Sequence, residues 1–143
     1  MLTDKPQKIY LGVYGIFIED GKVLVIKKAR GPYLGKYDLP GGGIEFNEKI
    51  LDCLSREIKE ETGSDLLSSE FLQINEYMCQ YKKNDELRDF HHIAVYYTVK
   101  LEIDNLKKDP DGEDSLGAEL IGLDKLNETN VAPIAWPIIE KFK

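Results

Sequence analysis

The sequence predicts an α/β protein that forms one domain. Two observations carry this prediction: short β-prone runs alternate with turn signals, and an amphipathic segment between residues 47 and 63 lies among them. The length of 143 residues is enough for one domain with a substantial core and too short for two comfortable ones. We therefore expect residues 1–143 to fold as a single unit.

The first part of the chain predicts a hairpin. Residues 9–18 are apolar at both alternating positions, as in a strand buried on two faces. Asp20-Gly21 is a hairpin turn signal, and residues 22–26 return as the partner strand. The basic patch that follows contains Lys27, Lys28 and Arg30.

A glycine-rich loop, residues 41–43, leads into an amphipathic helix that ends near Gly63. Glycines let the main chain approach a ligand closely. Asn47 is the expected cap at the start of the helix, and Gly63 is the expected left-handed stop. The predicted apolar stripe of this helix consists of Ile50, Leu51, Leu54 and Ile58.

Three glutamates occupy one neighbouring face of this helix, because Glu57, Glu60 and Glu61 stand at positions i, i+3 and i+4. Such acids repel one another unless a positive charge lies between them, and hard oxygen ligands suit Mg²⁺ or Mn²⁺. Arg56 points elsewhere and can pair with Glu48, which would brace the loop against the helix. The acids alone are more typical of a solvated helix face; their spacing from the glycine loop, Glu48 and Arg56 favours a site.

The residues from Gly42 to Ser64 resemble the Nudix box of the MutT-like Nudix hydrolases, whose pattern is G-x5-E-x7-R-E-U-x-E-E-x-G-U, with U aliphatic. Every position matches except the last, where Ser64 replaces an aliphatic residue. The resemblance implies an α/β/α sandwich with a central mixed β-sheet and the box helix packed on one side. It also implies metal-dependent hydrolysis of a phosphoanhydride bond in a nucleoside diphosphate linked to another moiety (NDP-X), by water attack on phosphorus.

The resemblance also implies roles for individual residues. The metal, Mg²⁺ or Mn²⁺, would be held by the box glutamates, by the main-chain carbonyl of Gly41 and by Asp114 or its neighbour Glu113. The expected catalytic residues are Glu48, Arg56, Glu57, Glu60 and Glu61. A box glutamate is the first candidate for the base, with Asp114 or Glu113 held in reserve. Substrate contacts are expected from Lys28, Gly42 and Gly43.

The second part of the chain predicts further strands and a closing helix. The expected strands cover residues 71–81, 90–101 and 119–123, with a polar turn at 82–89, a loop at 104–117 and a helix at 132–142. His91 and His92 point to opposite faces of a strand, so they cannot form one metal site alone. Surface or hydrogen-bonded core roles suit them better, although one could face a base or a phosphate. Trp136 suits core packing first and substrate stacking second.

Composition restricts the partners. The net charge of −7 argues against a nucleic-acid polymer or an anionic membrane, but not against a small phosphorylated ligand that brings its own metal ion. Cys53 and Cys79 suit reduced thiols, so the expected location is the cytoplasm. The residues leave homodimer formation open.

The sequence does not identify the leaving group. Ala135 stands where 8-oxo-dGTP-cleaving relatives carry an asparagine, and Gln80 stands where ADP-ribose-cleaving relatives often carry a proline. Tyr81 fits a tyrosine of the diadenosine polyphosphate hydrolases, a weak signal in a chain with eight tyrosines. The alternative to an enzyme is a non-catalytic nucleotide-binding or regulatory module, and the intact box glutamates favour the enzyme.

Overall fold

The computed structural model describes residues 7–104, 106–109 and 115–143. These described residues form two helices, a short 3₁₀ turn and eight strands. In chain order these elements are β1 (Gln7–Ile16), β2 (Ile18–Glu19), β3 (Lys22–Lys28), β4 (Tyr37–Asp38), β5 (Gly41–Gly43), α1 (Ile50–Thr62), β6 (Asp65–Lys83), β7 (Glu86–Glu102), β8 (Ser115–Gly122), η1 (Leu123–Lys125) and α2 (Trp136–Glu140).

The strands form two four-stranded sheets. The first has the order β5-β1-β7-β6, and it is mixed because β1 pairs with β7 in parallel while its other two pairings are antiparallel. The second is antiparallel and is centred on β3, which pairs with β2, β4 and β8. The expected mixed sheet is therefore present, with a smaller antiparallel sheet beside it.

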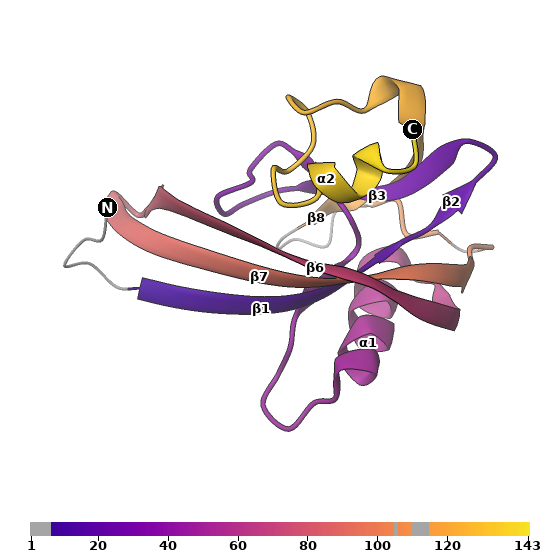
Figure 1. The fold of residues 1–143 in the computed structure, drawn as a ribbon, viewed down its shortest axis with the longest axis horizontal. Helices are drawn as coiled ribbons and strands as arrows, with labels where there is room; N and C mark the ends of the chain where they lie inside the picture. Colours follow the sequence, from indigo (N-terminus) through magenta and orange to yellow (C-terminus); the bar gives the residue numbers. More distant parts are fainter. Residues whose placement is uncertain (1–6, 105, 110–114) are drawn as a thin grey trace.

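The helices cover opposite faces of these strands, as Figure 1 shows. Alternate residues of β1 enter different cores: Val13 packs in the cluster that contains Leu54 and Ile58 of α1, whereas Tyr14 packs in the cluster that contains Ile138 of α2. This alternation confirms burial on two faces for residues 12–16 of β1 and produces the α/β/α layering, whereas Ile9 and Leu11 at the start of the strand are exposed.

The hairpin turn at Asp20-Gly21 is confirmed, since both residues have positive φ (54° and 74°) and lie between β2 and β3. The polar turn predicted at 82–89 is wrong in extent. The ladder between β6 and β7 continues to Lys83↔Glu86, and only Asn84 and Asp85 form the turn, with φ of 53° and 64°. Polar side chains gave the false signal, because this end of the long hairpin is solvent-exposed rather than turned.

The closing helix is also shorter than the predicted 132–142. Residues 132–135 form a turn in which the Ala135 N–H donates to the Ala132 carbonyl, and α2 begins only at Trp136. Pro133 and Pro137 have no N–H to donate, so a regular helix cannot run through this segment. Trp136 itself is half-buried and packs against the α2-side core, as the sequence favoured.

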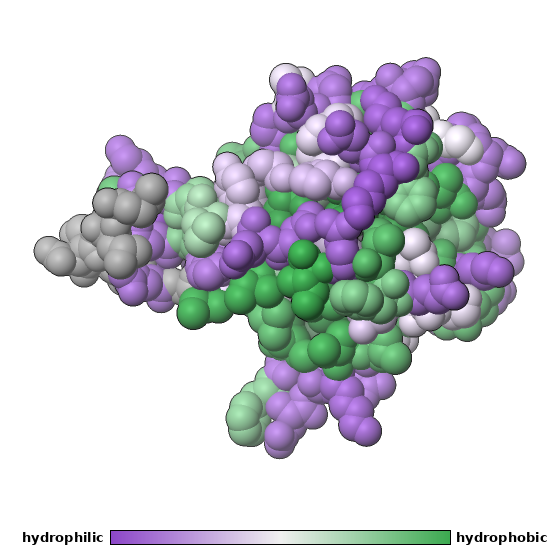
Figure 2. All heavy atoms as spheres, viewed as in Figure 1, coloured by the Kyte–Doolittle hydropathy of each residue, from purple (hydrophilic) through white to green (hydrophobic). Residues whose placement is uncertain are grey.

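One face of the mixed sheet stays partly uncovered beyond the end of α1. It carries five large apolar side chains that are 38% to 71% exposed: Ile9, Leu11, Phe71, Ile74 and Met78. Figure 2 shows hydrophobic surface across the part of the view where Figure 1 draws β1, β7 and β6. Among the described residues, no helix is long and apolar enough to cross a membrane.

Candidate active site

The glycine loop packs closely against β1 and α1. A Cβ atom on Gly41 would lie 2.1 Å from the Val13 carbonyl oxygen, and Gly41 has a φ of 145°. A Cβ atom on Gly42 would lie 2.5 Å from a carboxylate oxygen of Glu57. A residue larger than glycine would therefore displace the backbone of β1 at position 41, and at position 42 it would displace the Glu57 carboxylate.

The two ends of α1 differ from each other in how well the sequence predicted them. Gly63 is left-handed (φ 76°) and its N–H donates to the Lys59 carbonyl at 2.9 Å, as expected. The prediction that Asn47 caps the helix is wrong: Lys49 occupies the cap position and makes no side-chain cap bond. Asn47 instead has a φ of 65° and forms part of the loop before the helix, a conformation that asparagine adopts more readily than most residues.

The predicted stripe on α1 is confirmed only in part. Leu54 and Ile58 are fully buried, whereas Ile50 and Leu51 are 40% and 50% exposed. The first turn of α1 leaves these side chains in solvent, and the C-terminal turns pack on the sheets. Glu61 lies in one of these C-terminal turns and is only 8% exposed.

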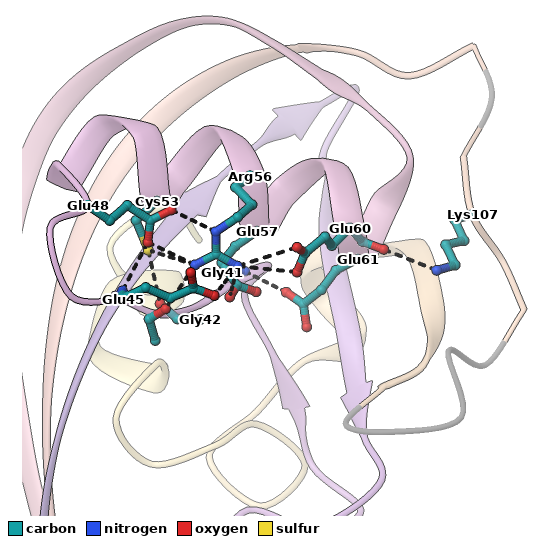
Figure 3. Close-up of polar contacts among 11 residues, drawn as sticks. Gly41, Gly42, Glu45, Glu48, Cys53, Arg56, Glu57, Glu60, Glu61 and Lys107 are labelled. Carbon is teal, nitrogen blue, oxygen red and sulfur yellow. Dashed lines mark hydrogen bonds and ion pairs between the residues drawn. The ribbon is translucent and has the colours of Figure 1, made fainter.

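Arg56 connects the loop to the helix, which confirms the expected pairing with Glu48. Its Nε and Nη2 donate to the two Glu48 carboxylate oxygens at 2.7 and 2.9 Å, and Nη2 also donates to the Gly43 carbonyl at 3.1 Å. Nη1 donates to Glu57 at 2.9 Å and to Glu60 at 3.3 Å (Figure 3). The bonds from Arg56 lower the pKa of Glu48 to about 2. Arg56 thus contacts the acids as well as the loop, which the sequence did not predict.

The three box glutamates differ in environment. The Glu60 side chain is 58% exposed, whereas that of Glu57 is 16% exposed. Glu61 accepts a hydrogen bond from the Gly41 N–H at 2.7 Å. Burial is the main cause that raises the pKa of Glu61 to about 8. The neighbouring Glu57 and Asp38 contribute to this rise, while Lys28 and the hydrogen bond from the Gly41 N–H oppose it.

The glutamates are not gathered as a coordination set in this structure. Glu57 and Glu60 face Arg56, Glu61 faces Gly41, and among the described residues no group of three or more His, Cys, Asp or Glu side chains is placed to hold a metal ion. Their donor chemistry nevertheless fits a hard cation, since carboxylate oxygens are hard ligands and the pKa of the buried Glu61 is raised by burial first and then by the charges of Glu57 and Asp38. Asp114 and Glu113 lie outside the described residues.

A pocket of about 190 Å³ lies beside the box. Its walls combine aromatic rings with two cationic side chains and one buried carboxyl group. The residues that line it are Tyr10, Tyr14, Lys28, Arg30, Gly31, Pro32, Tyr33, Asp38, Tyr81, Phe90 and His92. Lys28, a predicted substrate contact, is therefore placed in a pocket wall.

The positive charge of Lys28 acts on ionisable groups of both the pocket and the box. Burial raises the pKa of Asp38 to about 6, and the positive charge of Lys28 opposes that rise, as it does for Glu61. Burial lowers the pKa of His92 to about 4, and here Lys28 acts in the same direction. One lysine thus influences a box acid and two pocket residues.

Sequence reasoning missed most of this pocket. No sequence motif marks four of its residues, Tyr10, Tyr14, Tyr33 and Asp38. The sequence also does not distinguish His92 from the adjacent His91. The only available signal was the alternation in β7, which separates the buried His92 (2% exposed) from His91, whose side chain is 35% exposed and pairs with Glu76.

The NUDIX domain profile matches residues 7–142 of the chain. An ADP-ribose pyrophosphatase from Methanocaldococcus jannaschii is 31% identical over 126 residues, which cover 85% of this chain and 69% of that protein. A nucleoside triphosphatase NudI from Escherichia coli is 47% identical over 53 residues, which cover 36% of this chain and 38% of that protein.

Solved structures agree on the fold. The crystal structure of a MutT NUDIX hydrolase from Burkholderia pseudomallei has a TM-score of 0.73 at 22% identity and covers 94% of this chain and 97% of its own. With the profile match over nearly the whole described chain, this agreement confirms the α/β/α fold. The chain belongs to the Nudix family and is a pyrophosphohydrolase of that family.

Proposed function

We propose that the protein hydrolyses a phosphoanhydride bond of an NDP-X substrate in a divalent-metal-dependent reaction. The observation that carries this proposal is the position of Lys28, which lines the aromatic pocket and acts on the charges of both Glu61 and Asp38. A nucleotide with its base among the pocket rings would bring its phosphates towards the box acids.

A divalent ion suits the hard oxygen donors of the box. Glu57, Glu60, Glu61 and the Gly41 carbonyl would hold it, with Asp114 or Glu113 as a further ligand. When bound, Mg²⁺ or Mn²⁺ supplies neutralisation of phosphate charge and activation of water. Arg56 meets only part of this need, because three of its bonds, of 2.7 to 3.1 Å, go to Glu48 and the Gly43 carbonyl, and only its Nη1 donates to Glu57 and Glu60.

The chain's own residues orient the substrate and move the proton. Lys28 and the main chain at Gly42 and Gly43 would hold phosphate oxygens. A box glutamate would take the proton from the attacking water. Asp114 and Glu113 stay the reserve candidates.

The substrate proposal begins with ADP-ribose, because the M. jannaschii relative is named an ADP-ribose pyrophosphatase. Gln80, at the place where such relatives often carry proline, counts against it. The test is a panel of ADP-ribose, dNTPs including 8-oxo-dGTP, diadenosine polyphosphates, nucleotide sugars and coenzyme A. Each would be assayed with Mg²⁺, with Mn²⁺ and with EDTA.

Metal-dependent cleavage of one substrate would support the proposal, and its products would identify the phosphorus attacked. The second candidate is a nucleotide-binding module without turnover, favoured by the separated box glutamates. Nucleotide binding without cleavage of any panel member would support that module instead. We place either activity in the cytoplasm, in line with the two free cysteines.

We also propose that two copies of the chain pair through the apolar sheet face. Five large apolar side chains that are 38% to 71% exposed gather on this face, and a contiguous exposed apolar patch is a typical sign of an interface. Glu76 and His91 lie within it, with a Glu76 carboxylate oxygen 2.8 Å from His91 Nε2, so a two-fold partner meets this polar pair as well. Sedimentation should give a dimer for wild type and for Leu34→Glu, but a monomer for Ile74→Glu; a wild-type monomer would refute the pairing.

A further inference from the structure

His92 lies at the centre of the aromatic pocket, held by two phenols. The Tyr14 hydroxyl oxygen is 2.8 Å from Nε2 and the Tyr33 hydroxyl oxygen is 2.9 Å from Nδ1. The Tyr33 ring stacks on the imidazole at 5.6 Å, and the Tyr10 and Phe90 rings meet it edge-on. Both nitrogens of His92 are therefore occupied, and its ring cannot rotate without breaking these contacts.

The imidazole is neutral in this setting. His92 is 2% exposed and its two polar neighbours are hydroxyl groups rather than carboxylates. Burial, together with the nearby charge of Lys28, lowers its pKa to about 4. A neutral imidazole carries one N–H and one nitrogen lone pair.

The Tyr14 and Tyr33 hydroxyls and the His92 imidazole carry one more polar hydrogen than the contacts between them use. Two O–H groups and one N–H supply three protons, whereas the two contacts with His92 use only two. One phenol donates to His92 and the other accepts from it, so the accepting phenol keeps its own O–H. In the described part of the chain, neither hydroxyl has a second hydrogen-bond partner.

Both phenols are buried, since Tyr14 and Tyr33 are each 5% exposed, and both line the pocket. Buried donors are nearly always paired, and leaving one unpaired costs free energy. The surplus O–H can therefore find an acceptor only on a group that enters the pocket. Aromatic rings line this pocket, and such rings pack favourably against another flat, aromatic group.

We propose that this surplus phenol O–H selects the ligand by donating to an unprotonated ring nitrogen on its planar heterocycle. This inference rests on the proposed function, which makes the heterocycle the base of a nucleotide. Tyr14 and Tyr33 are the specificity-determining residues, and His92 is a positioning residue whose tautomer decides between them. If Nδ1 carries the proton, Tyr33 is the donor to the base; if Nε2 carries it, Tyr14 is.

The tautomer can be measured directly. The chain contains only two histidines, so ¹⁵N NMR of the imidazole nitrogens gives two sets of signals, and His92→Gln assigns them. We expect one His92 nitrogen to be protonated and the other bare between pH 6 and pH 8. A doubly protonated His92 in that range would overturn the proton count.

Binding tests the ligand contact. The probes are ADP and its 1-deaza, 3-deaza and 7-deaza analogues, each lacking one acceptor nitrogen, measured by calorimetry in EDTA. We expect one analogue to bind wild-type protein about tenfold more weakly than ADP, the size of one lost hydrogen bond. That preference should vanish in Tyr33→Phe or in Tyr14→Phe, whichever tyrosine the tautomer names, and persist in the control Tyr97→Phe.

The inference is overturned if no analogue binds more weakly than ADP, or if the preference persists in both Phe variants. Hydrolysis of ADP-ribose with Mg²⁺ is measured in parallel on the wild-type protein. Hydrolysis without an analogue preference would overturn this inference alone, and an analogue preference without hydrolysis of any panel substrate would overturn only the proposed reaction.

Discussion

The box and the aromatic pocket are neighbouring polar sites that are assembled over very different distances along the chain. In the box, Arg56 binds Glu48 eight residues away and Glu57 one residue away. In the pocket, His92 binds partners 78 and 59 residues away. The first site is a local pattern that a helix and a loop impose, whereas the second exists only after the strands have paired.

The pocket also depends on Gly12, which has no side chain that could contact a ligand. In the parallel pairing of β1 with β7, Tyr10 lies opposite His92 and Tyr14 lies opposite Tyr96. Tyr14 reaches back to His92 across Gly12, where a Cβ atom would lie 2.3 Å from the Tyr14 hydroxyl. Glycine between two tyrosines is thus part of the site, although nothing in its spacing predicts this.

The largest expected effect separates two acids within the box. Glu61→Gln keeps the bond from the Gly41 N–H but removes a buried charge, so we expect kcat/KM to fall by about 10²–10³. Glu60→Gln should also lose most activity, but less, because Glu60 is 58% exposed. Steady-state assays with Mg²⁺ and circular dichroism check both. Wild-type turnover in both variants would show that the box glutamates do not hold the metal.

The next prediction tests the connection between the two sites. Lys28→Gln removes the charge that acts on Glu61 and Asp38, and we expect KM to rise about tenfold, the size of one lost charged contact. The matched control is Lys27→Gln, because the adjacent Lys27 lies over the Tyr37 ring instead of lining the pocket. Equal effects of the two substitutions would mean that Lys28 has no specific contact with the substrate and that the basic patch only attracts anions in general.

The sequence predicted the box well because its contacts are short-range. The spacing of Glu48 and Arg56 was sufficient for the brace, and Gly63 was sufficient for the helix end. Asn47 failed as a cap because its type suits both a cap and a left-handed loop position, and only the loop's path decides between them. The long β6–β7 hairpin failed for a related reason: polar residues suit an exposed ladder as well as a turn.

The pocket could not be predicted, since pairing register, burial and charge state all enter it. Lys28 was the exception, chosen from the family resemblance rather than from its own surroundings. Asp38 illustrates the general case, because its raised pKa arises from burial, and burial is a property of the packed chain.

The pH dependence of stability distinguishes the buried box acid from the pocket groups. Unfolded Glu61 loses its proton near its ordinary pKa of 4.5, but folded Glu61 loses it near 8. The folded protein therefore binds an extra proton between these values, and stability falls as the pH rises towards 8. Asp38 has the same sign but finishes near pH 6, and His92 acts only below pH 6.5.

Between pH 6.5 and pH 8, the decline in stability should therefore come mainly from Glu61. Urea unfolding at both pH values should show it in EDTA, and Glu61→Gln should abolish it. Added Mg²⁺ should also reduce the decline, since a cation favours the ionised carboxylate. A decline that survives in Glu61→Gln would assign the titration to another group.

The smallest predicted effect concerns the one position where the box departs from its pattern. Ser64 is 1% exposed, and its hydroxyl has no hydrogen-bond partner among the described residues. The aliphatic place of the motif is thus a buried place here too. Ser64→Ala should raise the free energy of unfolding by about 1 kcal/mol, because it removes an unpaired buried oxygen. It should leave turnover unchanged, since the substitution does not alter the carboxylates.

Ser68→Ala, at an exposed position of β6, is the control and should change stability by less than about 0.5 kcal/mol. Urea unfolding of both variants makes the measurement. A less stable Ser64→Ala would mean that the hydroxyl is paired in solution, so that the end of the box depends on a contact beyond its own residues. In that case even the local site would share the pocket's dependence on the packed chain.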